Sequence, residues 1–371
     1  MKISVIVGTR PEIIKMSPAI RELEKRDIEY YVLHTGQHYS YNMDRLFFKE
    51  LELPEPDYKL NIGERYQTQG AQTGEMIKGM EKVFMKNRPD IVLVEGDTNT
   101  VLAGAISASK LHIKVGHVEA GLRSQDRSMP EELNRIITDH ISDYLFAPTE
   151  PSRQNLLREG IEEEKISVTG NTIVDAVYQN LKIAERKSRI FDKLGLEMEG
   201  YAVITAHRQE NVDDPERLAK IVKILNSLDY PAVFPIHPRT KKRLTESNYS
   251  IDNPQLKIIE PLGYLDFLIL LSKARFVLTD SGGIQEETNI MHVPCLTLRD
   301  NTERPETVSA GSNIVIGVEP DRVLPKINEL IENRELEKRM RTAEVAFGDG
   351  NAAMKTIKIL EISNEKGASH K

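Results

Sequence analysis

KISVIVGTRPEIIK (residues 2–15) places an apolar run, a polar turn and the start of a helix in immediate succession. The run at residues 2–7 is predicted to form a buried strand, and Pro11 suits the first turn of the helix that follows. The apolar residues after Pro11 recur at helical spacing and can share one face. The stretch is therefore predicted to be a βα unit, the building block of a parallel sheet.

The same alternation of short apolar runs and helical periodicity continues along the chain in two series. Strands are predicted at residues 2–7, 30–34, 91–95, 113–118, 144–147 and 166–170, and then at 201–206, 232–236, 256–260, 275–279, 294–298 and 313–317. We place the change of domain at residues 169–171, which predicts an N-terminal domain over 1–169 and a C-terminal domain over 170–351. The charged segment 333–363 is predicted to form two helices interrupted at 348–351. The expected fold class is α/β, with two Rossmann-like domains built on parallel sheets.

Length, charge and cysteine content limit the class of protein. The 371 residues suffice for two domains of ordinary size. The net charge of -7 argues against a protein that binds nucleic acid or a membrane surface, because such proteins usually carry a basic excess. Cys295 is the single cysteine, which fits a cytoplasmic setting. No apolar run approaches the roughly 20 residues that span a bilayer, so membrane insertion is not expected.

The sequence lacks the common cofactor and metal motifs. It has no G-x-G-x-x-G after a strand, no P-loop and no H-E-x-x-H motif or Cys/His cluster. Asp213 and Asp214 precede Pro215 at a predicted helix start, where helix capping is expected rather than metal binding. We therefore expect neither a metal nor an organic cofactor.

Two strand-to-helix turns are predicted to bind phosphate. In the first, Arg10 and Lys15 flank a helix start, where free N–H groups and the helix dipole favour an anion. In the second, Ser281, Gly282 and Gly283 join a strand to a helix, and glycines allow a phosphate to approach the backbone. Glu287 lies one turn into that helix, where it can bind a vicinal diol such as ribose. Together the two turns predict a nucleotide lying across a cleft.

Three carboxylates are predicted to point toward the same crevice, because they follow the carboxyl ends of neighbouring parallel strands or open the next helix. They are Asp97, Glu119 and Glu131. Structural roles remain open for each: Asp97 and Glu131 can cap helices, and Glu119 can pair with Arg123 or Arg135. His207 and Arg208 follow the strand at 201–206 and are expected to face the carboxylates from the other domain.

Eight motifs together carry a resemblance that covers nearly the whole chain. They are GTRPEIIKM, GDTNTVLAG, HVEAGLRS, MPEELNR, HRQEN, HPRT, DSGGIQEE and RDNTERPET. In this order and spacing they resemble the non-hydrolysing UDP-N-acetylglucosamine 2-epimerases, a family with the GT-B fold. Any one of the motifs alone would be weak, whereas the set is highly specific.

The resemblance implies an activity and a role for each motif. Members interconvert UDP-GlcNAc and UDP-ManNAc for polysaccharide biosynthesis without a metal or nicotinamide, and homodimers are implied. The GT-B fold implies a C-terminal helix, about residues 352–371, that packs back on the N-terminal domain. Asp97, Glu119 and Glu131 are implied as proton-transfer acids, with His207 at the diphosphate. The implied ligands of the nucleotide sugar are Arg10, Lys15, His207, Ser281, Gly282, Gly283, Glu287 and Arg304.

One segment departs from the pattern of the family. Many bacterial members have GQHRE where this chain has GQHYS at residues 36–40, in a region associated with an activating second UDP-GlcNAc site. Tyr39 and Ser40 therefore depart from the residues linked to that regulation. Gln37, His38 and Arg208 can still contribute to such a site, which stays open at this point.

Three alternatives to the epimerase remain. A hydrolysing epimerase would use similar residues but release free ManNAc and UDP. A GT-B glycosyltransferase would transfer the sugar to an acceptor. A catalytically silent sensor would bind UDP-GlcNAc without turnover, but the three carboxylates argue against it.

Overall fold

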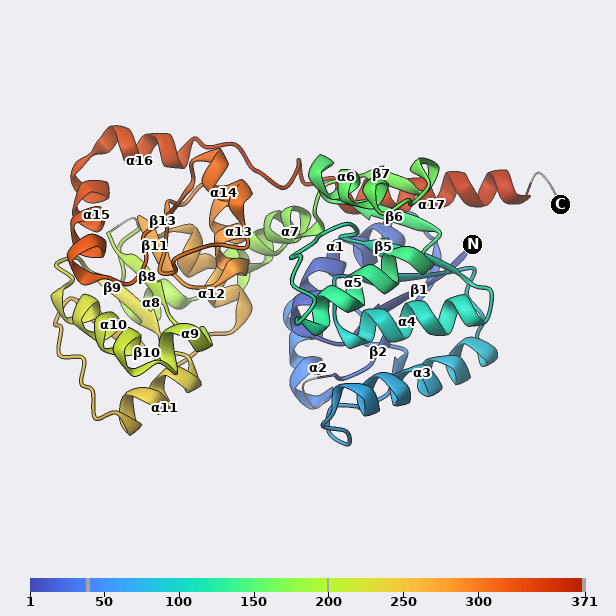
Figure 1. Cartoon of the computed structure of the whole chain (residues 1–371), viewed down its shortest axis with the longest axis horizontal. Helices are drawn as coiled ribbons and strands as arrows, with labels where there is room; N and C mark the ends of the chain where they lie inside the picture. The colour runs from blue at the N-terminus through green and yellow to red at the C-terminus, as the bar shows by residue number, and fades with distance from the viewer. Residues whose placement is uncertain (38–40, 199, 369–371) are drawn as a thin grey trace. The chain divides into compact units, whose positions relative to one another are not determined.

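The computed structural model describes residues 1–37, 41–198 and 200–368, which form two compact units (Figure 1). Unit 1 comprises Met1–Gln179 and Phe347–Lys371, and unit 2 comprises Asn180–Ala346. The units therefore divide inside a helix, α7 (Thr172–Lys187), rather than at the loop before it. The domain boundary at residues 169–171 stays a prediction.

Unit 1 contains a seven-stranded, wholly parallel sheet in the order β3-β2-β1-β4-β5-β6-β7. The strands are β1 (Lys2–Val7), β2 (Glu29–His34), β3 (Tyr58–Lys59), β4 (Ile91–Glu95), β5 (Lys114–Val118), β6 (Tyr144–Ala147) and β7 (Ile166–Val168). β4 and β5 are neighbours in register, with Glu95 opposite Val118. The residues that follow these two strands therefore leave the sheet side by side.

Most helices of unit 1 connect successive strands. They are α1 (Arg10–Lys25), α2 (Tyr41–Glu50), α3 (Gln69–Lys86), α4 (Asn99–Lys110), α5 (Pro130–Ile141), α6 (Glu150–Arg158), α7 and α17 (Ala352–Ala368), with a 3-10 turn at Glu163–Lys165. Thr98 is the N-cap of α4, and its hydroxyl accepts from the N–H groups of Thr100 and Val101. One face of the sheet packs against α3 and α4 through a fully buried apolar cluster that includes Val92, Val94 and Phe84.

The last helix returns to unit 1 although it follows unit 2 in the sequence. α17, red in Figure 1, packs against α1, and Arg26 pairs with Glu361 at 2.6 Å. The carboxylate of Asp175 on α7 accepts from the N–H groups of Ala352 and Ala353 and so caps α17. The chain thus re-enters the unit at a defined helix start.

Unit 2 contains a six-stranded parallel sheet in the order β10-β9-β8-β11-β12-β13. The strands are β8 (Ala202–Thr205), β9 (Ala232–Pro235), β10 (Leu256–Ile259), β11 (Phe276–Thr279), β12 (Cys295–Thr297) and β13 (Asn313–Val315). Both faces are apolar, since alternate residues enter two separate cores: Ile204 packs with residues of α10 and α15, and Val203 with residues of α12. Such strands lack polar alternation because helices cover both faces of the sheet.

The helices of unit 2 begin at recognisable caps. They are α8 (Ile190–Leu194), α9 (Gln209–Val212), α10 (Pro215–Ser227), α11 (Pro238–Glu246), α12 (Tyr264–Ser272), α13 (Gly282–Ile290), α14 (Pro305–Ala310), α15 (Pro320–Glu332) and α16 (Arg334–Arg341). Asp214 caps α10, as predicted, by accepting from the N–H groups of Glu216 and Arg217. Asp213 instead pairs with Arg239 and with Arg243, the latter at 2.9 Å.

The predicted fold class is confirmed: two Rossmann-like α/β units each contain a parallel sheet, as in the GT-B fold. All twelve predicted strands are present, and the charged tail forms α16 and α17 with a break that includes 348–351. β3, α2, α3, α7 and α8 were not predicted from the sequence. Within the described residues, no helix is long and apolar enough to cross a membrane.

Candidate active site

The turn between β1 and α1 is held by a buried carboxylate. Glu12 accepts from the N–H of Gly8 at 2.5 Å and from the hydroxyl of Thr98 at 2.5 Å. Burial raises the pKa of Glu12 to about 7, although these hydrogen bonds oppose the change. Glycine is required at position 8, because an added Cβ would lie 2.1 Å from the hydroxyls of Thr35 and Thr100. The turn therefore has one defined conformation.

Arg10 and Lys15 differ in their surroundings. Arg10 is the first residue of α1 and its guanidinium lies 5.8 Å from the centre of the Phe47 ring. Lys15 points to two carboxylates: its Nζ lies 2.5 Å from Glu119 Oε2 and 3.2 Å from Glu95 Oε1. The ammonium predicted to bind phosphate thus also contacts a predicted proton-transfer acid.

Glu119 follows β5 in an unusual backbone conformation. Its φ of 70° is in the left-handed region, which costs a non-glycine residue about 1 to 2 kcal/mol. Asn171 donates to Glu119 Oε2 at 3.0 Å, beside the contact with Lys15. The Glu119 carboxylate is therefore fixed by two groups from segments far away in the sequence.

Asp97 belongs to a second set of charges at the carboxyl end of β4. Arg135 on α5 donates to Asp97 Oδ2 at 2.5 Å and also pairs with Glu132 at 3.0 Å. Asn134 donates to the Asp97 carbonyl at 2.8 Å. Glu131 lies beside Glu132 in the first turn of the same helix. Arg135 thus links Asp97 to Glu132 in the first turn of α5.

The structural alternatives for these carboxylates can now be assessed. Glu119 pairs with Lys15, whereas Arg123 pairs with Asp139 at 2.8 Å and with Glu159 at 2.7 Å. Arg135 pairs with Asp97. The suggested pairing of Glu119 with Arg123 or Arg135 is therefore wrong. The cap of α4 is Thr98 and that of α5 is Met129, so neither Asp97 nor Glu131 occupies the N-cap position.

Gln37, one of the residues assigned to a possible second site, has a structural role. It is 5% exposed, and its Oε1 accepts from both the N–H and the hydroxyl of Thr100, at 3.0 and 2.9 Å. His38 lies outside the described residues, as do Tyr39 and Ser40.

In unit 2, the loop after β8 is organised by Asp280. This carboxylate is 0% exposed and accepts from the N–H groups of His207 and Arg208, each at 2.9 Å, and from Asn211 Nδ2 at 3.1 Å. The His207 ring lies 5.2 Å from that of His237. Burial lowers the pKa of His207, helped by His237 and neighbouring arginines and opposed by Asp280. The imidazole is therefore neutral at neutral pH and can donate one N–H.

The start of α13 combines open backbone with arginine side chains. Ser281 is the N-cap, and Gly282 and Gly283 form the first turn. A Cβ on Gly283 would meet nothing within 4 Å, and one on Gly282 would meet Arg208 at 3.6 Å. This first turn can accept an anion at its free N–H groups, with a guanidinium beside it.

Carboxylates flank that helix start. Arg208 lies 3.5 Å from Glu303, and Arg304 donates to Glu286 through Nε. Burial and the neighbouring Glu286 raise the pKa of Glu287 to about 8, so its side chain is largely protonated at neutral pH. A protonated carboxyl can both donate to and accept from a diol.

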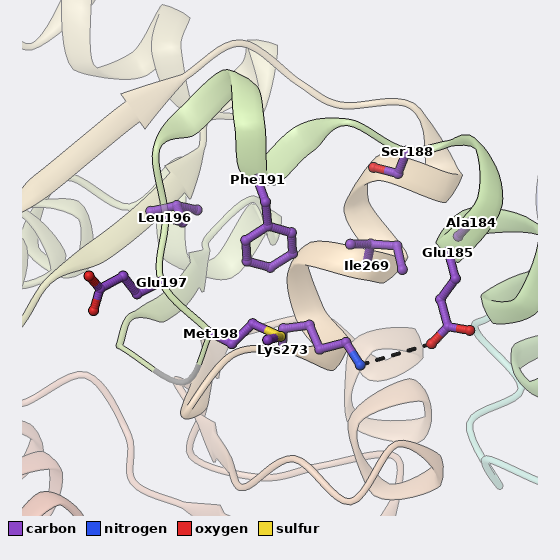
Figure 2. A pocket seen from close by; sticks show the side chains of 9 residues that line it. All are labelled: Ala184, Glu185, Ser188, Phe191, Leu196, Glu197, Met198, Ile269 and Lys273. Atoms are coloured by element: carbon purple, nitrogen blue, oxygen red, sulfur yellow. Dashed lines mark ion pairs between the residues drawn. The ribbon is translucent and has the colours of Figure 1, made fainter.

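A separate hollow in unit 2 contains none of the predicted site residues. A cavity of about 550 Å³ lies beside α8 and α12. Figure 2 shows the side chains that line it, among them the apolar Phe191, Leu196 and Ile269. Lys273 and Glu185 form an ion pair at its rim, at 3.9 Å. In the described part of the chain, no three His, Cys, Asp or Glu side chains are grouped to hold a metal ion.

Sequence reasoning missed three contributors. Glu95 is the last residue of β4, so the rule that used strand ends to find Asp97 applies to it equally. Asp280 and Asn171 act through hydrogen bonds to other site residues, and only Asp280 carried a signal, since it directly precedes Ser281.

The chain is similar to known proteins over nearly its whole length. A family model described as UDP-N-acetylglucosamine 2-epimerase matches residues 21–361. A UDP-N-acetylglucosamine 2-epimerase of Methanocaldococcus jannaschii is 55% identical, over 97% of this chain and 99% of the relative. A Pseudomonas aeruginosa UDP-2,3-diacetamido-2,3-dideoxy-D-glucuronate 2-epimerase is 40% identical, over 97% of this chain and 99% of the relative.

Solved structures agree with these relatives. The crystal structure of the M. jannaschii UDP-GlcNAc 2-epimerase with UDP-GlcNAc and UDP is 54% identical, with a TM-score of 0.83, over 98% of this chain and 100% of that one. The crystal structure of the Neisseria meningitidis UDP-GlcNAc 2-epimerase bound to UDP-GlcNAc is 38% identical, with a TM-score of 0.86, over 97% of this chain and 99% of that one.

Proposed function

Because the chain belongs to the UDP-N-acetylglucosamine 2-epimerase family, we propose that it is an isomerase that interconverts UDP-GlcNAc and UDP-ManNAc. The observation that carries the proposal is the 55% identity to an enzyme of this name over 97% of the chain. The acids at the ends of β4 and β5 and the anion-accepting start of α13 support it, since epimerisation needs both.

The reaction begins with loss of the nucleotide. The proton on sugar C2 is not adjacent to a carbonyl, so its removal requires the C1–O bond to break first or at the same time. UDP leaves with the bonding electron pair, a carboxylate takes the C2 proton, and 2-acetamidoglucal remains. UDP then adds back to C1 while a proton returns to the opposite face of C2.

Inversion at C2 is most simply achieved by two acid–base groups, one for each face. We propose Asp97, Glu119 and Glu131 as the candidates. The contact of Lys15 with Glu119 and that of Arg135 with Asp97 support this, because the two carboxylates have separate cationic partners. Separate partners allow the two groups to differ in proton affinity.

Departure of UDP is assisted by hydrogen-bond donors and cations. We propose that the N–H groups of Ser281, Gly282 and Gly283 and the imidazole of His207 hold the diphosphate, and that Glu287 binds the ribose. Arg10, Lys15 and Arg304 complete the set of proposed ligands. Single preorganised donors of this kind contribute about 3 to 4 kcal/mol to catalysis.

Incubation with UDP-GlcNAc in D₂O tests the proposal. We expect UDP-ManNAc carrying deuterium at C2, without added metal or nicotinamide, as measured by NMR and mass spectrometry. A hydrolysing epimerase would instead release ManNAc and UDP. A glycosyltransferase would transfer the sugar to an added acceptor without exchange at C2, and a silent sensor would leave UDP-GlcNAc unchanged.

A second substrate is suggested by the 40% identical diacetamido-glucuronate epimerase. A parallel incubation with UDP-2,3-diacetamido-2,3-dideoxy-D-glucuronate separates the two. We expect turnover of UDP-GlcNAc at least about tenfold faster, which corresponds to about 1.4 kcal/mol in transition-state binding. The reverse order would assign the chain to the acidic sugar.

We also propose that the enzyme acts as a cytoplasmic homodimer and that its product enters polysaccharide biosynthesis. Light scattering of the purified protein and cell fractionation test the first two points. Whether Gln37, His38 and Arg208 bind an activating second UDP-GlcNAc is tested by the shape of the rate curve. A sigmoidal dependence on UDP-GlcNAc concentration would support such a site, and a hyperbolic one would not.

A further inference from the structure

Two carboxylates and one ammonium meet in the interior of unit 1. The side chains of Glu95, Glu119 and Lys15 are 2%, 7% and 15% exposed. Lys15 Nζ lies 2.5 Å from Glu119 Oε2 but 3.2 Å from Glu95 Oε1. Within the described residues, Glu95 Oε1 has no hydrogen-bond partner. The ammonium is thus engaged mainly by Glu119.

Among the described residues, the charges near this group are a further carboxylate and cations that are engaged elsewhere. Glu12, on the same face of α1, adds a further carboxylate near Glu95. The nearby cations are engaged elsewhere, since Arg135 pairs with Asp97. His117, on the neighbouring strand β5, contacts Asp139 and the Gly96 carbonyl through its two nitrogens. With both Glu95 and Glu119 ionised, two buried carboxylates share the single ammonium of Lys15, which is costly away from water.

We propose that Glu95 is a positioning residue that holds a proton shared with Glu119, and thereby keeps Lys15 on Glu119 and Glu119 ready for proton transfer. This inference rests on the proposed epimerase function. The pKa of Glu95 is raised well above the ordinary value by burial and by the nearby Glu119 and Glu12, against the opposing effect of Lys15. The pair titrates as a unit, so the proton that it shares leaves at a pH well above the ordinary glutamate range.

Loss of that proton has a defined consequence. Ionised Glu95 competes with Glu119 for Lys15 and raises the proton affinity of Glu119. Turnover is therefore expected to fall as the pH rises through the titration of this shared proton. A glutamine at position 95 imitates the protonated acid permanently, because its amide N–H replaces the O–H and its carbonyl remains an acceptor.

Glu95→Gln is the test, with Glu81→Gln on the exposed surface of α3 as the matched control. We expect kcat of Glu95→Gln at pH 6 to fall by no more than about tenfold, and its alkaline limb to move up by at least about one pH unit. Glu81→Gln should keep the wild-type profile. An unchanged alkaline limb in Glu95→Gln would overturn the proposal.

A second measurement does not depend on turnover or on the fold of that variant. In protein labelled with ¹³C at the glutamate carboxyls, Glu95 should titrate well above its ordinary range, and Glu119→Gln should move that titration down. The titration of Glu287, in unit 2, serves as the internal reference, because Glu119→Gln should leave it unchanged. Titration of Glu95 near its ordinary value of 4.5 would refute the shared proton. Absence of UDP-ManNAc with the high titration present would sink the proposed function and leave the shared proton standing.

Discussion

Removal of the Asp280 carboxylate is expected to destabilise unit 2 and weaken UDP binding together. The side chain is fully buried and accepts from two backbone N–H groups, those of His207 and Arg208. Its third donor, Asn211, keeps a second acceptor in the Leu298 carbonyl at 2.9 Å. Asp280→Ala therefore leaves two N–H groups without a partner.

The expected loss of stability follows from these two unpaired N–H groups. A fully buried donor without a partner costs about 1 to 3 kcal/mol. Because the hydrogen bonds of these two N–H groups are only partly buried, Asp280→Ala should lower the free energy of unfolding of unit 2 by about 2 kcal/mol, the lower end of the range for two donors. Asp280→Asn keeps one oxygen, and its amide can donate toward His207 Nδ1, which lies 3.5 Å from the carboxylate. We expect it to recover at least half of the loss.

Urea-dependent hydrogen exchange, measured by mass spectrometry on peptides of residues 180–346, reports the stability of unit 2 directly. Titration calorimetry with UDP should show affinity reduced at least about tenfold in Asp280→Ala, or 1.4 kcal/mol. The matched control is Asp300→Ala, an exposed partner of Arg217, which should leave stability nearly unchanged. Stability of Asp280→Ala within about 1 kcal/mol of wild type would refute the reasoning.

Three further predictions concern the charged groups. Lys15→Met should lower kcat by at least about 100-fold, because Glu119 loses its cationic partner. Steady-state kinetics measure kcat, and UDP affinity serves as the control. An equal loss in kcat and in UDP affinity would contradict this role of Lys15. Asp97→Asn and Glu131→Gln should each reduce turnover by about 100-fold or more while UDP affinity changes little; equal, small effects on both would count against an acid–base role. The pKa of Glu287 is raised to about 8 in the folded state, whereas the unfolded chain releases this proton near the ordinary value of 4.5. Between pH 4.5 and about 8 the folded state therefore holds one more proton, and wild-type stability should decline as the pH rises through this range. Glu287→Gln should make that decline shallower in urea titrations at pH 5 to 9 and weaken UDP binding, because other buried acids such as Glu12 keep their own share of it. An equally steep decline in both proteins would exclude Glu287 as a source.

Local patterns were sufficient for the elements and for much of the candidate site. Apolar runs predicted every strand except the two-residue β3, because buried parallel strands are apolar on both faces. The capping role of Asp214 was also predictable, since it depends only on the next few residues. The rule that polar residues after parallel strands share one edge indicated Asp97 and Glu119.

Pairings between distant segments were not predictable in this way. The sequence suggested Arg123 or Arg135 for Glu119, but the partner is Lys15, 104 residues away on α1. Arg135 pairs with Asp97 instead. Which cation reaches which carboxylate depends on how α1 and α5 pack against the sheet, and that packing is set by many apolar contacts rather than by the charges themselves.

The sequence alone therefore determined that the chain forms two parallel α/β units with polar strand ends, and which motifs they carry, because strand burial, helix starts and turns depend on neighbouring residues. Tertiary structure decided the order of the strands, the cluster of Lys15, Glu95 and Glu119, and the role of Asp280. These features require side chains from separate segments to share a buried volume, where the loss of water makes each charge depend on its neighbours.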